Sequence, residues 1–253
     1  VDLYLRLDER EYPLHAALKL VSGVKQTPLC DGRGLKHTLE RRVFELAKAE
    51  LGNIRFKQAF IPVAVDRMGL AEAVAEVSDQ IVSGDLMVAL GVPIPLYGIP
   101  AFKRVARVML PMVSYFPMSM IFYGSDGAEQ EPKYVKYFEE SDLIAGDFLF
   151  MRKYMPKSLA GKTVVTNTTT EENIALLKER GVKTVITTTP RAVADSTSTL
   201  STPTPARPTT FRPGAASRTA LVILVSDRTT RATASLTRGS SSDSGSFFPM
   251  TST

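Results

Sequence analysis

Residues Gly161 to Pro190, GKTVVTNTTTEENIALLKERGVKTVITTTP, constrain the fold more than any other stretch of the sequence. Two β-branched runs, Thr163–Thr166 and Thr184–Thr187, are typical of strands that are packed on both faces. Between them the apolar residues change to a period of about 3.6, which predicts a helix over about residues 170–180. A strand, a helix and a strand within one short segment imply parallel strands joined by a right-handed crossover.

The ends of this predicted helix carry their own signals. Thr169 can serve as the N-cap, with Glu172 three residues later as its partner in a capping box. Gly181 suits the left-handed position after the last turn, and Leu177 and Val182 are placed to make the apolar contact of a Schellman cap. The helix is therefore predicted to begin after Thr169 and to end at Gly181.

The rest of residues 1–190 alternates strand and helix patterns, which favours a mainly parallel, doubly wound (Rossmann-like) α/β sheet in one domain or two lobes. The predicted strands are residues 1–7, 27–30, 60–65, 86–90 and 142–145. The predicted helices are residues 13–24, 35–51, 69–77, 132–140 and 148–154. Because a strand-like run begins at Val1, we expect the true N-terminus to lie upstream.

Residues 191–253 differ in composition from the rest of the chain. The net charge is +5, but residues 1–190 hold 24 Lys and Arg against 23 Asp and Glu, so this region gives no electrostatic case for nucleic-acid binding. Of the last 63 residues 25 are Ser or Thr and none is Lys, and only Leu221 to Val225 resembles a foldable segment. We expect residues 191–253 to be a low-complexity tail without packed structure, natively disordered or produced by a reading-frame shift. The abrupt break after a predicted core strand favours the frame shift.

Two uncharged runs, Gly91–Phe102 and Val108–Ser125, raise the question of membrane insertion. Each is near the lower length limit for a membrane span and is interrupted by prolines, so buried loops and helices are favoured instead. The Met-rich region 91–123 is an alternative candidate for a homo-oligomer interface. The one cysteine, Cys30, excludes an intramolecular disulfide and suits the cytoplasm, and no metal site is expected from two distant histidines.

Parallel pairing predicts a group of polar residues at one edge of the sheet, beside a helix N-terminus. The residues expected there, as candidates for binding a cofactor phosphate or a carboxylate, are Thr166, Asn167, Thr168, Thr169, Thr188 and Thr189. The alternative interpretation is that these threonines only build strands and cap the helix.

Two further sets of candidates lie between predicted strands and helices. Asp31, Gly32 and Gly34 begin a glycine-containing turn whose backbone amides could hold a phosphate, although the third glycine of a dinucleotide fingerprint is replaced by His37. Asp66 and Asp147 each follow a predicted strand, where a carboxylate could bind a ribose hydroxyl or act as a catalytic base. Ordinary turn and capping roles explain both sets as well.

Four blocks of sequence resemble a bacterial family labelled quinate 5-dehydrogenase, over most of residues 1–190. They are VDLYLRL, TPLCDGRGLKHTLERR, DLIAGDFLFMRKYMP and GKTVVTNTTTEENIALLKERGVKTVITTTP. The resemblance implies an oxidoreductase that uses NAD or NADP to oxidise a small hydroxylated acid such as quinate or shikimate. Members of that family continue past TTTP with a folded segment, which the tail here does not resemble.

The catalytic residues of authentic quinate and shikimate dehydrogenases do not carry over. Those enzymes have a Lys after N-V-T-x-P and an Asp within N-T-D-x-x-G, and neither motif is present here. The alternative function is a non-catalytic α/β module that binds an anionic metabolite or a nucleotide at the same edge of the sheet.

Overall fold

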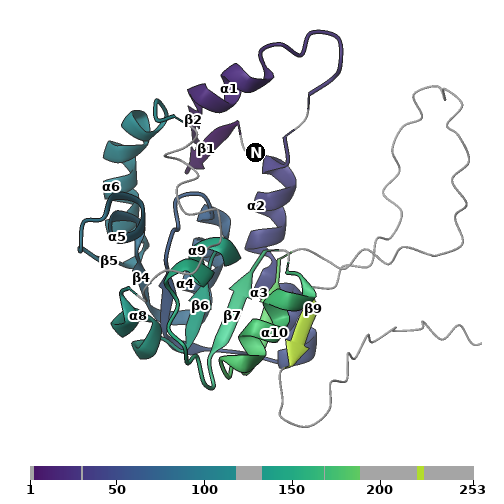
Figure 1. Cartoon of the computed structure of the whole chain (residues 1–253), viewed down its shortest axis with the longest axis vertical. Helices are drawn as coiled ribbons and strands as arrows, with labels where there is room; N and C mark the ends of the chain where they lie inside the picture. The colour runs from purple at the N-terminus through teal and green to yellow at the C-terminus, as the bar shows by residue number, and fades with distance from the viewer. Residues whose placement is uncertain (1–2, 30, 118–132, 168, 189–220, 225–253) are drawn as a thin grey trace, which may run out of the picture.

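The structure, a computed structural model, describes residues 3–29, 31–117, 133–167, 169–188 and 221–224 (Figure 1). Its larger sheet joins seven described strands in the order β5-β4-β3-β6-β7-β8-β9. These strands are β3 (Phe56–Ile61), β4 (Ser78–Ser83), β5 (Leu96–Tyr97), β6 (Leu143–Ala145), β7 (Thr163–Thr166), β8 (Thr184–Thr187) and β9 (Leu221–Leu224). Five neighbouring strands, β4, β3, β6, β7 and β8, run parallel. The two outer strands, β5 and β9, pair antiparallel with their neighbours. The predicted mainly parallel α/β sheet is therefore confirmed.

Helices surround this sheet, and a small antiparallel hairpin precedes it. The hairpin consists of β1 (Tyr4–Leu7) and β2 (Arg10–Pro13). The helices of the described residues are α1 (His15–Val21), α2 (Arg33–Arg41), α3 (Val43–Leu51), α4 (Met68–Val77), α5 (Asp85–Leu90), α6 (Gly98–Val113), α8 (Val135–Glu140), α9 (Phe148–Tyr154) and α10 (Glu171–Glu179). The predicted helices at residues 69–77 and 148–154 are confirmed to within one residue.

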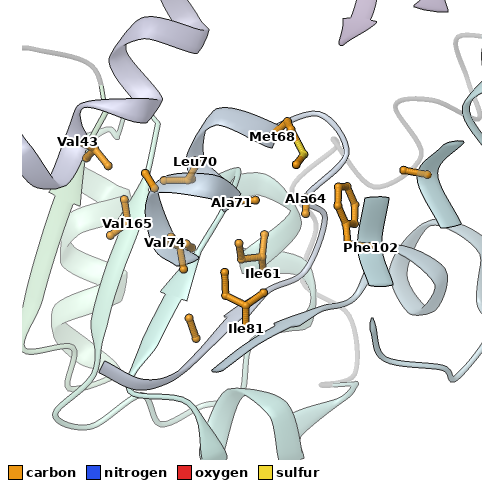
Figure 2. Packing of buried hydrophobic residues seen from close by; sticks show 14 of the residues in the cluster. Val43, Ile61, Ala64, Met68, Leu70, Ala71, Val74, Ile81, Phe102 and Val165 are labelled. Carbon is orange, nitrogen blue, oxygen red and sulfur yellow. The ribbon is translucent and has the colours of Figure 1, made fainter. Parts of the chain in front are cut away.

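The sheet carries a hydrophobic core on each face, because successive strand residues point to opposite sides. Ile61, Ile81 and Val165 belong to one core, which α3, α4 and α6 cover. Figure 2 shows residues of α4 packed beside Ile61 in this core. Their strand neighbours, such as Phe60 and Val164, belong to the second core, which α8, α9 and α10 cover. Both faces of the sheet are therefore covered by helices.

The predicted strand–helix–strand unit is confirmed for β7, α10 and β8. β7 and β8 pair in parallel, with Val165 opposite Ile186, and α10 connects them. The helix ends in a Schellman motif, because the backbone N–H of Val182 donates to the carbonyl of Leu177 at 3.0 Å. Gly181 adopts the left-handed conformation that this motif requires, with φ of 77°.

The N-cap of α10 lies one residue later than predicted. The hydroxyl oxygen of Thr170, not that of Thr169, accepts a hydrogen bond from the backbone N–H of Asn173, at 3.3 Å. Both threonines precede the helix, and sequence alone does not decide between adjacent capping residues. The predicted capping box between Thr169 and Glu172 is wrong.

We expect Thr170→Ala to lower the free energy of unfolding by about 1 kcal/mol, because it leaves an N-terminal amide of α10 without its side-chain acceptor. Thr169→Ala is the matched control, with the same chemical change one residue away, and should cost clearly less. Urea denaturation of the two variants measures the difference. Equal losses would contradict the assignment of Thr170 as the cap.

Several predicted elements before residue 100 are wrong. Residues 86–90 lie in the helix α5, and the strand is β4, whose polar start, Ser78-Asp79-Gln80, concealed it in the sequence. The short apolar run at 86–90 has too few residues for its period to separate helix from strand. Residues 27–29 form no strand, and Cys30 lies outside the described residues. The predicted helix over residues 35–51 is broken at Arg42 into α2 and α3.

The sequence after Pro190 contributes one strand to the sheet. β9 pairs antiparallel with β8, with Leu221 opposite Thr187. The expectation that residues 191–253 lack packed structure is therefore wrong for Leu221–Leu224, and the remainder of that tail lies outside the described residues. The physical reason is that the unpaired edge of β8 offers free backbone donors and acceptors, which an apolar, β-branched segment can satisfy.

The apolar region from residue 91 forms a buried helix face and an exposed one. In α6, Phe102, Ala106 and Leu110 are buried, as predicted for a core helix. Val108 and Met112 of the same helix are exposed. Among the described residues, no helix is long and apolar enough to cross a membrane. A homo-oligomer interface in region 91–123 stays a prediction, and residues 118–123 lie outside the described part of the chain.

Candidate functional site

The connections of the sheet reverse direction between β3 and β6. From β3 the chain passes through α4 to β4 on one side, whereas β6, β7 and β8 follow one another on the other side. The loops at the carboxyl ends of β3 and β6 therefore lead away from each other. In open α/β sheets ligands bind at this point of reversal. We call the edge where the parallel strands end the carboxyl edge, and its position makes it the main candidate for a ligand site.

Arg67, in the loop after β3, connects three carboxylates at this point of reversal. Its guanidinium donates to Glu40 Oε1 at 2.9 Å and to Asp147 Oδ2 at 2.8 Å. The Nε atom lies 3.6 Å from Asp66 Oδ2. The side chains of Arg67 and Glu40 are only 12% and 3% exposed, so the ion pair between them is shielded from water. We call Glu40, Asp66, Arg67 and Asp147 the Arg67 cluster.

Burial and charge act in opposite directions on the pKa values in this cluster. Burial disfavours the charge on Arg67, but Asp66, Glu40 and Asp147 together raise its pKa, so the guanidinium stays protonated. Burial raises the pKa of Glu40, while Arg67 and Lys36 oppose that rise. Glu40 therefore keeps its proton to a higher pH than an ordinary carboxyl group, as general acids and bases in proteins do.

Asp147 is tied to the neighbouring structure through both of its oxygens. Its Oδ1 accepts from the backbone N–H of Leu149 and so caps α9, at 2.9 Å. Its Oδ2 accepts from Asn167 Nδ2 at 2.8 Å as well as from Arg67. Asn167 in turn accepts from the hydroxyl of Thr166 at 3.0 Å. Through these bonds Asn167 holds Asp147, and with it the Arg67 cluster, in place beside the ends of β6 and β7.

The predicted polar group beside α10 is only partly within the described residues. The backbone N–H of Thr188 donates to the carbonyl of Thr166 at 2.8 Å, so the ends of β7 and β8 do meet. Thr166 and Thr188 are both buried, which leaves them strand-building roles. Thr169 precedes the cap of α10, while Thr168 and Thr189 lie outside the described residues.

The glycine-containing turn at Asp31 does not have the predicted structural context. No strand leads into it from residues 27–29, and α2 begins at Arg33. A Cβ atom built at Gly32 or Gly34 meets nothing within 4 Å, so no close approach of the backbone requires glycine there. The turn is consequently not the phosphate loop of a strand–turn–helix unit. Asp31 and Gly34 instead line a cavity.

A cavity of about 390 Å³ lies between β1, α2 and the start of α4. We call it the α2 cavity. Its lining residues are Tyr4, Leu5, Arg6, Glu11, Asp31, Gly34, Lys36, His37, Thr38, Glu40, Val65, Asp66, Met68 and Gly69. Three of the predicted site residues, Asp31, Gly34 and Asp66, meet in its wall. Asp147 is not among the lining residues, and neither are Thr166, Thr169 and Thr188, the threonines of the predicted group that the structure describes.

Gly69 allows α4 to approach α2 closely beside the cavity. A Cβ atom at Gly69 would lie 3.2 Å from Glu40 Cβ, from Glu40 Oε2 and from the carbonyl oxygen of His37. A side chain at this position would therefore press on the backbone of α2 and displace the Glu40 carboxyl group. Gly69 is the one glycine of the loop and helix after β3, and its role is packing.

The protonation state of His37 in the cavity wall follows from its partner. Arg41 Nε donates to His37 Nε2 at 3.0 Å, and an arginine nitrogen can only donate. His37 Nε2 must therefore be unprotonated, so the neutral ring carries its proton on Nδ1. Burial, Arg41 and Arg6 lower the pKa of His37, against an opposing effect of Glu72, which agrees with a neutral imidazole.

Glu40, His37 and Arg67 were not among the residues predicted from the sequence. Glu40 lies three residues before Val43, on the apolar side of the helix predicted over residues 35–51, and a charged residue at such a position is a signal that the sequence offered. His37 was noticed only as the residue that breaks a glycine fingerprint. Arg67 gives no local signal, because the two carboxylates that accept its hydrogen bonds are 27 and 80 residues away.

Comparison with curated proteins finds no match, and comparison with solved structures finds none either. A family comparison matches residues 34–200, more than half of the 253 residues. The matched segment contains Glu40, Arg67 and Asp147, and with them the whole Arg67 cluster. The chain thus belongs to the family described as Domain of unknown function (DUF8754).

Proposed function

We propose that the chain binds a small hydroxylated acid, such as quinate or shikimate, in the α2 cavity. The observation that carries this proposal is the arrangement of charge around one cavity, in which Arg6 and Lys36 lie among the carboxylates of Glu11, Asp31, Glu40 and Asp66. Carboxylates accept hydrogen bonds from the hydroxyl groups of a ligand, and cationic side chains bind its acid group.

The size and position of the cavity support the same proposal. Its volume of about 390 Å³ lies near the lower end of the range for small-molecule sites, roughly 300–1,000 Å³. It adjoins the loop after β3, where the connections of the mainly parallel sheet reverse direction. Carboxylates outnumber cations in its wall, which favours a ligand with several hydroxyl groups over a simple anion such as inorganic phosphate.

The described residues do not fit the nicotinamide cofactor that the sequence resemblance implies. A dinucleotide fingerprint needs glycines in the turn between the first strand and its helix. The turn between β3 and α4 runs from Pro62 to Arg67 without a glycine, and the turn with Gly32 and Gly34 follows no described strand. The binding of the acid is therefore proposed without a cofactor.

An NAD- or NADP-dependent dehydrogenase is the second candidate function. The observation in its favour is Glu40, a buried carboxyl group with a raised pKa in the cavity wall, which is suited to take the proton of a hydroxyl group during oxidation. The resemblance of four sequence blocks to quinate 5-dehydrogenases points to the same reaction. In this case the cofactor would have to be held without a glycine-rich loop.

Isothermal titration of the purified chain with quinate and with shikimate tests the proposed binding. Asp66→Asn should weaken binding by about 10–100-fold, since hydrogen bonds to a charged group contribute about 1.5–3 kcal/mol each. Asp79→Asn is the control, because Asp79 is exposed on β4, pairs with Arg55 and does not line the α2 cavity.

Absorbance at 340 nm, recorded with each acid plus NAD or NADP, separates the two candidate functions. Binding without a change in absorbance supports the binding module, and an increase in absorbance supports the dehydrogenase. Absence of binding by both acids, or equal weakening by Asp66→Asn and Asp79→Asn, would overturn the assignment of the α2 cavity.

A further inference from the structure

His37 and Glu40 lie three residues apart on α2, so they share one face of the helix. Both line the α2 cavity, which α2 shares with β1 and with the loop before α4. They are of the two residue types that most often transfer protons in enzymes. Their environments also shift their pKa values toward each other, since that of Glu40 is raised and that of His37 is lowered.

The neutral His37 ring is fixed as a hydrogen-bond donor. With Nε2 accepting from Arg41, only Nδ1–H remains to donate. Arg41 is itself held by an ion pair to Glu72 of α4, so the ring is oriented from a second helix. A neutral imidazole that donates one hydrogen bond can stabilise negative charge that develops on a carbonyl oxygen.

Glu40 has one oxygen engaged and one available. Oε1 accepts from Arg67 at 2.9 Å, and no described residue donates a hydrogen bond to Oε2. Oε2 lies over Gly69, the residue whose missing side chain leaves room there. The side chain is therefore held in place through one oxygen and can accept a proton on the other.

We propose that His37 and Glu40 form a cofactor-independent proton-transfer site that enolises small α-hydroxycarbonyl acids. The proposal rests on the proposed binding of a small hydroxylated acid in the α2 cavity and adds a reaction to it. The substrate class is a hydroxylated acid that carries a carbonyl group beside a C–H bond. Arg6 and Lys36 of the same cavity supply the cations for its carboxylate.

The proposed step needs no oxidant or reductant. Glu40 takes a proton from the carbon next to the carbonyl group, so the C–H bond breaks and an O–H bond forms on Oε2. The electron pair of the broken bond becomes the C=C bond of an enolate, whose negative oxygen accepts the hydrogen bond from His37 Nδ1–H. Glu40 then returns the proton to the same carbon, which restores the carbonyl group and the acid.

Proton exchange with D₂O tests this step directly, because a proton held by Glu40 exchanges with solvent. The full chain is incubated in D₂O with hydroxypyruvate, and separately with 3-dehydroshikimate, without any nucleotide. Loss of the proton signal next to the carbonyl group is followed by NMR. We expect exchange well above the rate in buffer, and isothermal titration with the same two acids reports binding separately.

Substitutions assign the two roles. Glu40→Gln should slow the exchange by about 100-fold or more, the usual contribution of a general base, while Glu40→Asp retains part of it. His37→Phe should slow it by about 100–1,000-fold as an oxyanion donor is lost, and His37→Gln, which keeps an N–H donor, should restore part of the rate. Glu45→Gln is the matched control, because Glu45 is exposed on α3, pairs with Arg42 and does not line the α2 cavity.

The pH profile of the exchange provides a readout that a merely structural role would not change. The groups that face His37 are Arg41, Arg6 and Glu72, and those that face Glu40 are Arg67, Lys36 and Asp66. The rate should rise with pH as Glu40 loses its proton, with a midpoint above the ordinary value for Glu because burial raises this pKa. This rising limb should move to lower pH in Glu40→Asp only if the residue at position 40 is the base.

The possible outcomes separate the proposed proton transfer from the proposed binding of the acid. Binding of the acids without exchange overturns the proton-transfer site and leaves the binding function standing. Absence of both binding and exchange overturns the proton-transfer site, and absence of binding by quinate and shikimate as well overturns the binding function. Exchange that persists in Glu40→Gln while the variant is folded and binds the acid would show that Glu40 is not the base.

Discussion

The substitution Arg67→Met should lower the free energy of unfolding by about 3–5 kcal/mol at pH 8, the typical cost of removing one partner from a buried ion pair. Methionine keeps much of the volume of the side chain but none of its charge. Glu40, Asp66 and Asp147 would then lie close together without the cation that now neutralises them. Urea denaturation at pH 8 measures the loss.

The loss should become smaller at low pH. Without Arg67, burial and mutual repulsion raise the folded-state pKa values of the three carboxyl groups above their unfolded values. A carboxyl group whose pKa is raised in the folded state does not reduce the free energy of unfolding below its unfolded-state pKa. It reduces that free energy as the pH rises through its folded-state pKa. The difference between the variant and the parent should therefore be smaller at pH 5 than at pH 8.

Two further variants isolate the role of Arg67. Arg67→Lys should recover only part of the stability, because an ammonium group cannot donate to Glu40 and Asp147 in the forked geometry of a guanidinium. Adding Glu40→Gln to Arg67→Met should restore part of the loss by removing one uncompensated charge. If Arg67→Met is as stable as the parent at pH 8, the cluster is not the electrostatic centre that its geometry indicates.

The substitution Asp85→Ala should lower the free energy of unfolding by about 2–5 kcal/mol. Asp85, at the start of α5, accepts hydrogen bonds from the backbone N–H groups of Ala64 and Val65 and from the hydroxyl of Ser83. Alanine leaves both amides without their acceptor, and a buried unsatisfied donor costs about 1–3 kcal/mol. The same bonds hold the loop after β3, so the variant should also weaken the binding of any ligand in the α2 cavity.

Asp85→Asn is the matched control for this prediction. Its carbonyl oxygen can still accept from the two amides, and its NH₂ group can donate to Ser83, so most of the stability should be retained. A loss as large as that of Asp85→Ala would instead indicate that the negative charge, and not the pattern of hydrogen bonds, holds the loop.

The pH dependence of Asp85→Ala has a definite sign. Burial raises the pKa of Asp85 to about 6, against the effects of the hydrogen bonds from Ser83, Val65 and Ala64. Because this folded pKa lies above the unfolded value, the group contributes more stability at low pH and loses it as the pH rises through about 6. The variant lacks this titration, so its deficit relative to the parent should be larger at pH 5 than at pH 7.5.

The sequence alone determined the elements whose signals are local. The period of the side chains and the position of Gly181 predicted β7, α10 and β8 together with their parallel pairing, and all three formed. A short apolar run with too few residues for a clear period did not determine its own structure, so α5 was mistaken for a strand. Strand polarity also predicted that polar residues meet at the carboxyl edge, and the ends of β7 and β8 do meet there.

The tertiary structure decided which side chains meet at that edge. Arg67, Glu40 and Asp147 belong to three segments that lie far apart in the sequence, and each taken alone is an ordinary charged residue. They are buried next to one another because the connections of the sheet reverse between β3 and β6 and because α2 packs closely against Gly69. The pairing of charges is a long-range property because Coulomb interactions and burial depend on distance in space, which the order of residues along the chain does not specify.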